Sequence, residues 1–233
     1  MPDPYHFIVH TLRSGSTLLR CLLDEHRLLC SPPEIKWFCT DQSVRKAALK
    51  PILKKFCLKY NNIGHPGELY DAILKKTRKT ILIDKSPDNL FHIRHIDTLF
   101  PHSKFIWIMR HPRDVHHSLL KLNWYEEIGL SDDYIKNAIR ACERGLSGIG
   151  ENRKTIVKYE HLTSSPAETL TRLCRFLGVD FEPSMLTYDP DKLWGKGDFG
   201  DRIKTGRVLE AETSDMATPE NLKGVAEKYY SKK

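Results

Sequence analysis

The chain has no long apolar run and no paired cysteine motif, and both absences narrow what it can be. No apolar stretch approaches the roughly 18 residues of a membrane-spanning helix. The N-terminus lacks the pattern of a secretory signal peptide. The six cysteines form no C-x-x-C pair and have no zinc-ligand spacing. We therefore expect no membrane span, free buried thiols and a reducing compartment, the cytoplasm.

Acidic residues are fewer than basic residues in this chain. Lysine and arginine number 37 against 30 acidic residues, which leaves a net charge of +7. This surplus favours an anionic ligand, although a solvated basic surface is the alternative. The basic residues form no arginine-rich or aromatic-interleaved patch, so we expect no nucleic-acid partner. With 233 residues, 40% of them hydrophobic, the chain is predicted to form a single domain with a sizeable core.

Short apolar runs alternate along the chain with helical patterns. The strands predicted from them span residues 5–11, 80–84, 104–109 and 155–159. The predicted helices span residues 17–26, 87–100, 112–123, 165–177 and 219–230. Such alternation is typical of the α/β class, here a three-layer fold with a central parallel sheet flanked by helices. The order of the strands cannot be read from the sequence.

Two segments depart from this rhythm. Residues 41–78 have a helical pattern that Pro51 and NNIGHPG interrupt, and we predict a helical lid or acceptor lobe there. Residues 189–218 are rich in glycine, lysine, aspartate and threonine. A long segment of this kind in a compact domain is often functional, so we predict a mobile basic loop.

The loop HTLRSGST, residues 10–17, joins the first predicted strand to its helix. Gly15 allows close approach of the backbone, Ser14, Ser16 and Thr17 add hydroxyls, and Arg13 adds a cation. Free N–H groups at a helix start bind anions. Nucleotide hydrolases need G-x-x-x-x-G-K-S/T, and this loop has neither the first glycine nor the lysine. We therefore predict that the loop binds a phosphate-like group but lacks the lysine that nucleotide hydrolases use. The alternative is an ordinary glycine turn before a helix.

Two further loops leave predicted strands at the same edge of the sheet. Arg110 follows residues 104–109, and Ser118 lies eight residues later in the next helix, where the pair can grip a second phosphate. Lys85 follows residues 80–84. Asp84, at the end of that strand, resembles a metal-holding carboxylate and would suit a phosphoryl-transfer enzyme. By themselves, the charges around Arg110 are equally consistent with a surface cluster.

Together these segments resemble the sulfotransferases that use 3′-phosphoadenosine 5′-phosphosulfate (PAPS). The shared motifs are RSGSTLLRCLLDEH, SPPEIKWF, DKSP, FIWIMRHPRDVHHS and IVKYEHLTSSPAETLTRLCRFLGVDF, in the family's order and spacing. The resemblance covers residues 5–187. It is strongest to bacterial and polyketide-synthase sulfotransferases, then to tyrosylprotein and heparan sulfate sulfotransferases. It implies a P-loop-like fold and transfer of a sulfuryl group to a small-molecule, carbohydrate or peptide hydroxyl.

The resemblance also implies roles for individual residues. It assigns the 5′-phosphosulfate to residues 13–17, the 3′-phosphate to Arg110 and Ser118, and adenine to Tyr159, for which a core aromatic is the alternative. Lys196 and Lys204, in the late basic segment, are implied to close over the phosphates. The product would be adenosine 3′,5′-bisphosphate, and no metal is required because a sulfuryl group carries less charge than a phosphoryl group.

Two catalytic residues follow from the same resemblance. Lys85 would stabilise charge on the bridging oxygen, and Glu34 would be the general base, unless it only pairs with a nearby cation. The histidine base of cytosolic sulfotransferases is replaced here by Pro87, and Lys36 replaces the histidine of the PPELH motif of polyketide-synthase domains. The open alternatives are a P-loop-type small-molecule kinase and a catalytically inactive nucleotide-binding module. The histidines at 92 and 95 are a fallback base or metal pair, or simply packing residues.

Overall fold

The strands form one parallel sheet in the centre of the molecule. The computed structural model describes residues 4–59, 63–193, 195 and 202–230. Within this part of the chain the sheet has five strands in the order β2-β3-β1-β4-β5, all parallel. The strands are β1 (Tyr5–His10), β2 (Leu29–Cys30), β3 (Ile81–Asp84), β4 (Phe105–Met109) and β5 (Lys154–Lys158).

Alternating strand side chains build two cores, one on each face of the sheet. Phe7 and Val9 of β1 point into one core, whereas Ile8 points into the other. A strand buried on both faces reads as a continuous apolar run, because successive side chains face opposite sides. This explains why β1, β3 and β4 are visible in the sequence, whereas β5, in which Ile156 is exposed, shows only a short Ile-Val run.

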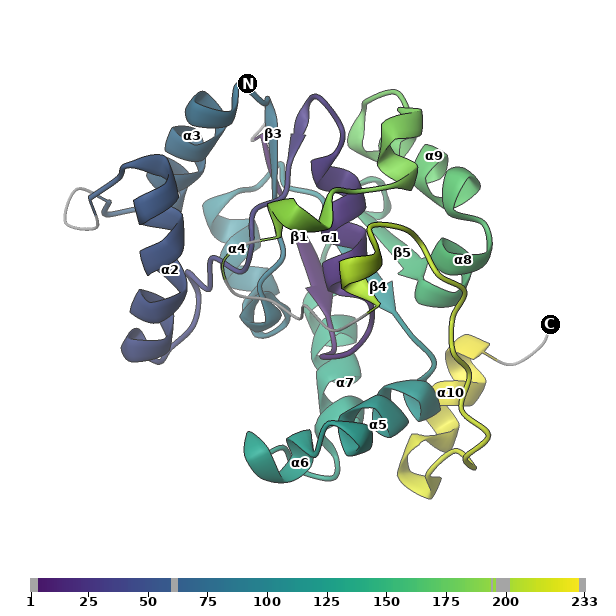
Figure 1. Cartoon of the computed structure of the whole chain (residues 1–233). Coiled ribbons are helices and arrows are strands. Elements are labelled where there is room, and N and C mark those ends of the chain that lie inside the picture. The colour runs from purple at the N-terminus through teal and green to yellow at the C-terminus, as the bar shows by residue number, and fades with distance from the viewer. Residues whose placement is uncertain (1–3, 60–62, 194, 196–201, 231–233) are drawn as a thin grey trace.

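Helices cover both faces, which gives the predicted three layers (Figure 1). One core is shared with α1 (Ser16–Asp24), α8 (Tyr159–Ser164) and α9 (Pro166–Leu177). The other is shared with α2 (Gln42–Phe56), α3 (Pro66–Thr77), α4 (Ile93–Leu99), α5 (Pro112–Lys121) and α7 (Tyr134–Leu146). The short α6 (Trp124–Glu127) follows α5, and α10 (Lys223–Tyr230) closes the described chain.

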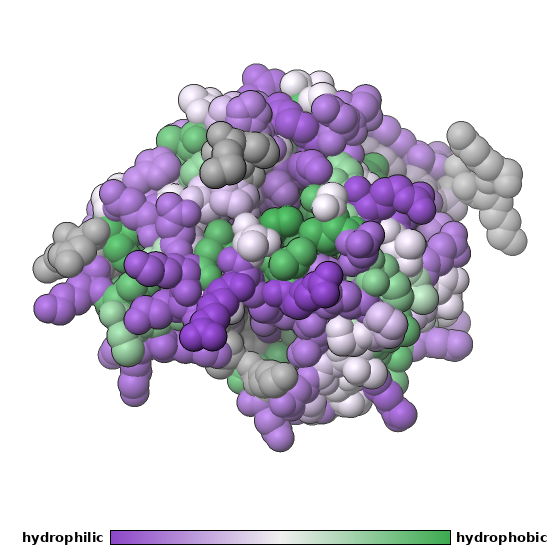
Figure 2. Space-filling view, turned by 90° about the horizontal axis from the view of Figure 1, so that it is seen from above, coloured by the Kyte–Doolittle hydropathy of each residue, from purple (hydrophilic) through white to green (hydrophobic). Residues whose placement is uncertain are grey.

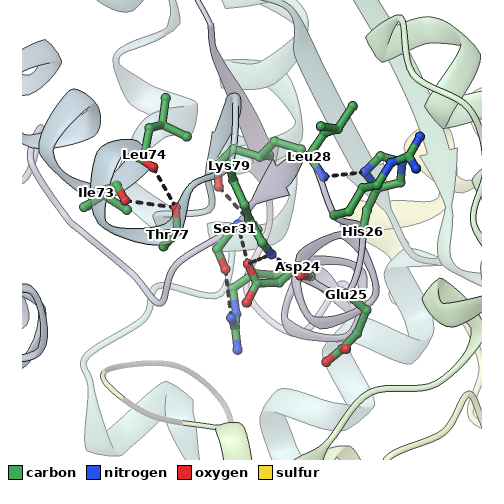
Figure 3. A network of polar contacts seen from close by, with 12 residues as sticks. Asp24, Glu25, His26, Leu28, Ser31, Ile73, Leu74, Thr77 and Lys79 are labelled. Carbon is green, nitrogen blue, oxygen red and sulfur yellow. Dashed lines mark hydrogen bonds and ion pairs between the residues drawn. The ribbon is translucent and has the colours of Figure 1, made fainter.

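A polar network fixes the end of α1 that is remote from its first turn (Figure 3). Asp24 accepts hydrogen bonds from Lys79 and, at 2.9 Å, from the backbone N–H of Ser31. Arg20 donates to the carbonyl of Ser31 at 2.9 Å, and the Ser31 hydroxyl donates to the carbonyl of Ile83. These bonds tie α1 to the strands β2 and β3 and so fix the helix that begins at the candidate site.

Several predictions of elements are confirmed, and others need correction. The sheet has a fifth strand, β2, which is only two residues long. The predicted helix 87–100 is divided into a 3-10 helix, Pro87–Phe91, and α4. The helix α7 was not predicted, and α2 continues through Pro51 instead of stopping there. A proline removes one N–H donor and crowds the preceding turn, but the surrounding packing of α2 tolerates both.

The two unusual segments differ in character. Leu49 and Ile52 of α2 and Tyr70 of α3 are fully buried in the same core as Phe7, so the helical segment packs on the sheet. The described parts of 189–218 form two short 3-10 helices, Pro190–Lys192 and Ile203–Thr205. Their roles as acceptor lobe and mobile loop stay predictions.

The state of the cysteines and the character of the surface can also be compared with the sequence. All six cysteines are free and all except Cys57 are buried, as predicted. Among the described residues, no helix combines the length and apolar character needed to cross a membrane. Seen from the end at which β1 begins, the surface is mostly hydrophilic, with apolar side chains gathered near its centre (Figure 2).

Candidate active site

The three predicted loops converge because their strands are neighbours. The sheet order places β3, β1 and β4 side by side, and all run in the same direction. Lys85, the loop of residues 11–15 and Arg110 directly follow these strands. The carboxyl ends of parallel strands are where open α/β sheets bind ligands. The structure therefore confirms that one sheet edge carries the candidate site.

The backbone of the first loop is shaped for close approach. Gly15, the residue before α1, has φ 87°, and Arg13 has φ 64°. A Cβ atom added at Gly15 would lie 2.2 Å from Cδ2 of Tyr159, so no larger residue fits. The first turn of α1 contains Ser16 and Thr17 but no acidic side chain. Its free N–H groups therefore have no acidic side chain in their own helix turn to compete for them.

One hydroxyl of this loop has no partner. Ser14 Oγ is buried and lies within hydrogen-bonding distance of no group in the described part of the chain. A buried hydroxyl without a hydrogen bond costs free energy, so it marks a place where a ligand atom can bind. An anion seated on the N–H groups of α1 would satisfy it.

The two predicted catalytic residues form an ion pair. Lys85 Nζ donates to Glu34 Oε1 at 2.8 Å, and Lys36 Nζ lies 3.5 Å from Glu34 Oε2. The Lys85 side chain is buried, and its Nζ is 3.4 Å from the hydroxyl of Thr17 in the first turn of α1. Glu34, the candidate base, and the cation Lys85 thus lie next to each other at the start of α1.

Burial and charge oppose each other in this pair. Burial disfavours the ionised form of Glu34, but the Lys85 ammonium and Lys36 outweigh it and hold the pKa of Glu34 below its usual value. Burial of Lys85 lowers its pKa, and the attraction of Glu34 only partly offsets this. Glu34 is therefore ionised, as a general base must be.

His10 belongs to the site but was given no role in the sequence analysis. It ends β1, is buried, and its Nδ1 lies 2.8 Å from the carbonyl oxygen of Thr11. Because a carbonyl only accepts, Nδ1 carries the proton and Nε2 presents a lone pair, which has no partner among the described residues. Burial and the nearby charge of Lys85 lower its pKa to about 4. Its position at a strand end was the available signal.

The residues predicted for the second phosphate also lie close together. Arg13 Nε donates to Ser118 Oγ at 3.0 Å, across the space between the first loop and α5. The Arg110 guanidinium carbon lies 4.9 Å from the ring centroid of Tyr159, a cation–π contact. Arg110 Nε is buried and has no partner in the described chain. The four predicted residues Arg13, Arg110, Ser118 and Tyr159 therefore share one wall.

The late segment reaches this wall through its backbone. Arg110 Nη2 donates to the carbonyl of Glu212 at 3.0 Å, and the N–H of Ser214 donates to Asp114 Oδ1 at 2.9 Å. Lys204 lies in the 3-10 helix Ile203–Thr205, and its contact with the phosphates stays a prediction. Lys196 lies outside the described residues.

The histidines considered as a fallback pack against aromatic rings. His92 stacks on the Phe38 ring with the centroids 6.1 Å apart, and His95 contacts the same ring edge-on with the centroids 5.9 Å apart. His116 Nδ1 is 2.7 Å from the hydroxyl of Tyr125. Within the described ranges, no three side chains of the metal-binding types are grouped around a common point. These contacts favour packing roles for the three histidines.

Comparisons with known proteins agree with this geometry. The model of the sulfotransferase family matches residues 4–183. Protein-tyrosine sulfotransferase 2 of Gallus gallus is 26% identical over 96% of this chain and 62% of its own. Protein-tyrosine sulfotransferase of Drosophila melanogaster is 25% identical over 80% and 40%. The chain thus spans less than two thirds of the length of these curated relatives.

Solved structures show the same fold. The sulfotransferase domain from the curacin biosynthetic pathway superposes with a TM-score of 0.70 at 22% identity, covering 98% of this chain and 97% of the other. The sulfotransferase domain of the Synechococcus PCC 7002 olefin synthase gives 0.69 at 24% identity, covering 98% and 94%. With a family match across most of its length and this fold, the chain belongs to the sulfotransferase family.

Proposed function

We propose that this protein transfers the sulfuryl group of PAPS to a hydroxyl acceptor. The observation that carries the proposal is the ion pair between Glu34 and the buried Lys85, which lies against Thr17 at the start of α1. This arrangement places a base, a cation and an anion-binding helix start together. Family membership supports sulfuryl transfer and does not support the kinase alternative.

The residues present fit the donor. Ser14 Oγ and Arg110 Nε are buried polar atoms without partners among the described residues, on the two walls that would hold the 5′ and 3′ groups. Gly15 lets the backbone N–H groups approach an anion. Tyr159 beside it is buried in the core and its ring contacts Arg110, so its burial favours the core-aromatic alternative over a contact with adenine. Ser118 would complete the 3′-phosphate site beside Arg110, and Arg13, which donates to Ser118, would link this site to the loop predicted for the 5′-phosphosulfate. Arginine and hydroxyl donors are well suited to a phosphate.

The chemistry is an in-line displacement at sulfur. PAPS supplies the sulfuryl group: the bond from sulfur to the acceptor oxygen forms, the bond to the bridging oxygen breaks, and adenosine 3′,5′-bisphosphate leaves. Glu34 takes the acceptor proton as the new bond forms. Lys85 stabilises the negative charge that develops on the leaving oxygen. Glu34 Oε1 and Lys85 Nζ are 2.8 Å apart, and in the reaction they would act on the two sides of the sulfur, the carboxylate on the attacking oxygen and the ammonium on the leaving oxygen.

The cations and the helix N–H groups already supply charge stabilisation, so we propose transfer without a metal ion. Aromatic side chains also lie beside the first loop: the Trp124 ring lies 5.1 Å from the Arg13 guanidinium carbon, and the Tyr134 hydroxyl accepts a hydrogen bond from the N–H of Leu12. Two relatives are named for acceptors with a tyrosine and an omega-hydroxyl group. We propose a hydroxyl acceptor of this kind, with its oxygen beside Glu34. The free, mostly buried thiols support a reducing compartment such as the cytoplasm.

The deciding experiment measures sulfate transfer from PAPS to a panel of phenols, primary alcohols, sugars and tyrosine peptides. We expect turnover of at least one acceptor, unchanged by a strong chelator and abolished by Lys85→Ala. Lys104→Ala is the matched control, because it removes a partly buried lysine that contacts Phe176 and lies at the opposite end of β4. Magnesium-dependent turnover of ATP without sulfate transfer would establish the kinase alternative. Bisphosphate binding without transfer to any acceptor would establish the inactive module.

A further inference from the structure

The turn that follows Glu34 has an unusual backbone. Lys36, two residues later, has φ 53°, in the left-handed region that residues with a Cβ atom rarely adopt. Ile35, between them, is fully buried. The carbonyl of Lys36 accepts a hydrogen bond from the N–H of Cys39 at 3.1 Å. Such a conformation persists only where its surroundings hold it, so the contacts of Lys36 bear on where Glu34 lies.

A buried chain of hydrogen bonds reaches this turn. The backbone N–H of Lys36 donates to Ser86 Oγ at 2.8 Å, and Ser86 Oγ donates to Asp84 Oδ1 at 2.6 Å. The other carboxylate oxygen of Asp84 accepts from the Tyr70 hydroxyl at 2.7 Å. Ser86, Asp84 and Tyr70 are all fully buried. Because the serine hydroxyl gives its one proton to Asp84, its oxygen is left to accept from Lys36.

The same strand end holds both members of the catalytic pair. Asp84 is the last residue of β3, and Lys85 follows it directly. Asn89 Nδ2 donates to the carbonyl of Asp84 at 3.2 Å, which fixes the backbone at this point. Lys85 therefore leaves a rigid support, and Ser86, one residue further, grips the turn that carries Glu34. The hydrogen bond between Lys36 and Ser86 thus joins the PPEIK motif to the DKSP motif, although the two residues are 50 positions apart in the sequence.

We propose that Asp84 and Ser86 are positioning residues: Asp84 orients the Ser86 hydroxyl, which holds the turn at Lys36 so that Glu34 lies against Lys85. The inference rests on the proposed function, because it concerns the base of that reaction. It also gives the buried carboxylate of Asp84 a role other than metal binding. Without the Ser86 oxygen, the left-handed turn loses its buried acceptor and relaxes, and the Glu34 carboxylate moves away from Lys85.

The test compares two variants, each of which removes one hydroxyl group that donates a hydrogen bond to Asp84. Ser86→Ala removes a hydrogen bond to Asp84 and also the acceptor of the Lys36 N–H, whereas Tyr70→Phe removes only the bond to Asp84. Ser86→Ala should lower kcat by about 10²-fold, the usual effect of a displaced reacting group. Its KM for PAPS and its affinity for adenosine 3′,5′-bisphosphate should stay close to those of the wild type. Tyr70→Phe should keep kcat near the wild-type value.

Amide hydrogen exchange at Lys36 is a second readout that needs no activity. Ser86→Ala should lose the protection of this amide, and Tyr70→Phe should keep it. Equal losses of kcat in the two variants, or full protection of Lys36 in Ser86→Ala, would overturn the positioning role. If the wild type transfers no sulfate, the proposed function fails, and the exchange at Lys36 still decides whether Ser86 holds the turn.

A third variant tests the same proposal if the Ser86→Ala protein does not fold. Asp84→Ala removes both carboxylate oxygens, so the Ser86 hydroxyl loses the acceptor that orients it. We expect the same loss of kcat and of protection at Lys36. An Asp84→Ala protein with normal turnover and normal protection would contradict the assignment of Asp84.

Discussion

Arg13 donates a hydrogen bond from Nε to Ser118 Oγ at 3.0 Å, which joins the loop before α1 to the helix after β4. Arg110 lies against the same loop, with Nη1 3.5 Å from the carbonyl of Arg13. These residues are far apart in the sequence, and they meet because β1 and β4 are neighbouring parallel strands. A 3′-phosphate would insert into a wall that already exists, with little reorganisation on binding.

Replacement of Arg110 should weaken binding of the bisphosphate. A charge-assisted hydrogen bond is worth about 1.5–3 kcal/mol, which corresponds to about a ten- to a hundred-fold loss of affinity for Arg110→Ala. The measurement is titration calorimetry with adenosine 3′,5′-bisphosphate. Arg94→Ala, at an exposed position on α4, is the matched control and should bind normally. Unchanged affinity in a folded Arg110→Ala protein would make Arg110 only a surface charge. 5′-AMP, which lacks the 3′-phosphate, should not distinguish the two proteins.

Replacement of Glu34 should separate catalysis from binding. Glu34→Gln keeps the shape and removes the basicity, so turnover should fall by about 10²–10⁴-fold. Affinity for the bisphosphate should change little. The pKa of Glu34 is held below its usual value by Lys85 and Lys36 against the effect of burial, so the acid limb of the wild-type rate profile should lie below the ordinary glutamate range. Near-normal turnover of Glu34→Gln would remove Glu34 from the mechanism, and lost bisphosphate binding would make it structural.

Alanine at Gly15 should damage both stability and binding. The residue has φ 87°, and its new Cβ would meet the Tyr159 ring at 2.2 Å. The left-handed backbone alone costs roughly 1–2 kcal/mol for a residue with a Cβ, and the clash with the ring adds to that. Urea unfolding measures the loss of stability. Gly148→Ala is the control, because nothing lies within 4 Å of its Cβ and its φ is not positive. Equal stability of the two variants would contradict the close approach of Tyr159.

Because His10 is buried, the free energy of unfolding should decrease as the pH is lowered. Its folded pKa is about 4, whereas the pKa of an unperturbed histidine is 6.5, so between these values the unfolded chain binds a proton that the folded chain does not. The free energy of unfolding then decreases as pH falls through this window. With about 1.4 kcal/mol for each pKa unit, the contribution of His10 reaches about 3 kcal/mol at the acid end.

The measurement is urea unfolding at several pH values across that window. His10→Gln, which cannot titrate, should show a shallower dependence on pH than the wild type. His161→Gln, at an exposed position, is the control and should keep the wild-type slope. Parallel stability profiles for wild type and His10→Gln would show that His10 is protonated equally in both states.

The sequence by itself determined the local parts of this protein. The strands β1, β3 and β4 are visible because burial on both faces requires continuous apolar runs. The first loop is recognised by the glycine and hydroxyl residues that a helix start needs to bind an anion. Arg110 and Lys85 could be placed at one sheet edge because each follows a strand, and parallel strands end together. These inferences need only the chain near each residue.

Only the tertiary structure decided which of these parts meet. The strand β2 has two residues, Leu29 and Cys30, and exists because β3 offers them a partner, so no local pattern could show it. The neutral state of His10 depends on its burial beside Lys85, and the turn at Lys36 depends on Ser86, 50 residues away. Burial and long-range hydrogen bonds are set by the packing of distant segments, and a sequence pattern reports on neighbours along the chain, not across the fold.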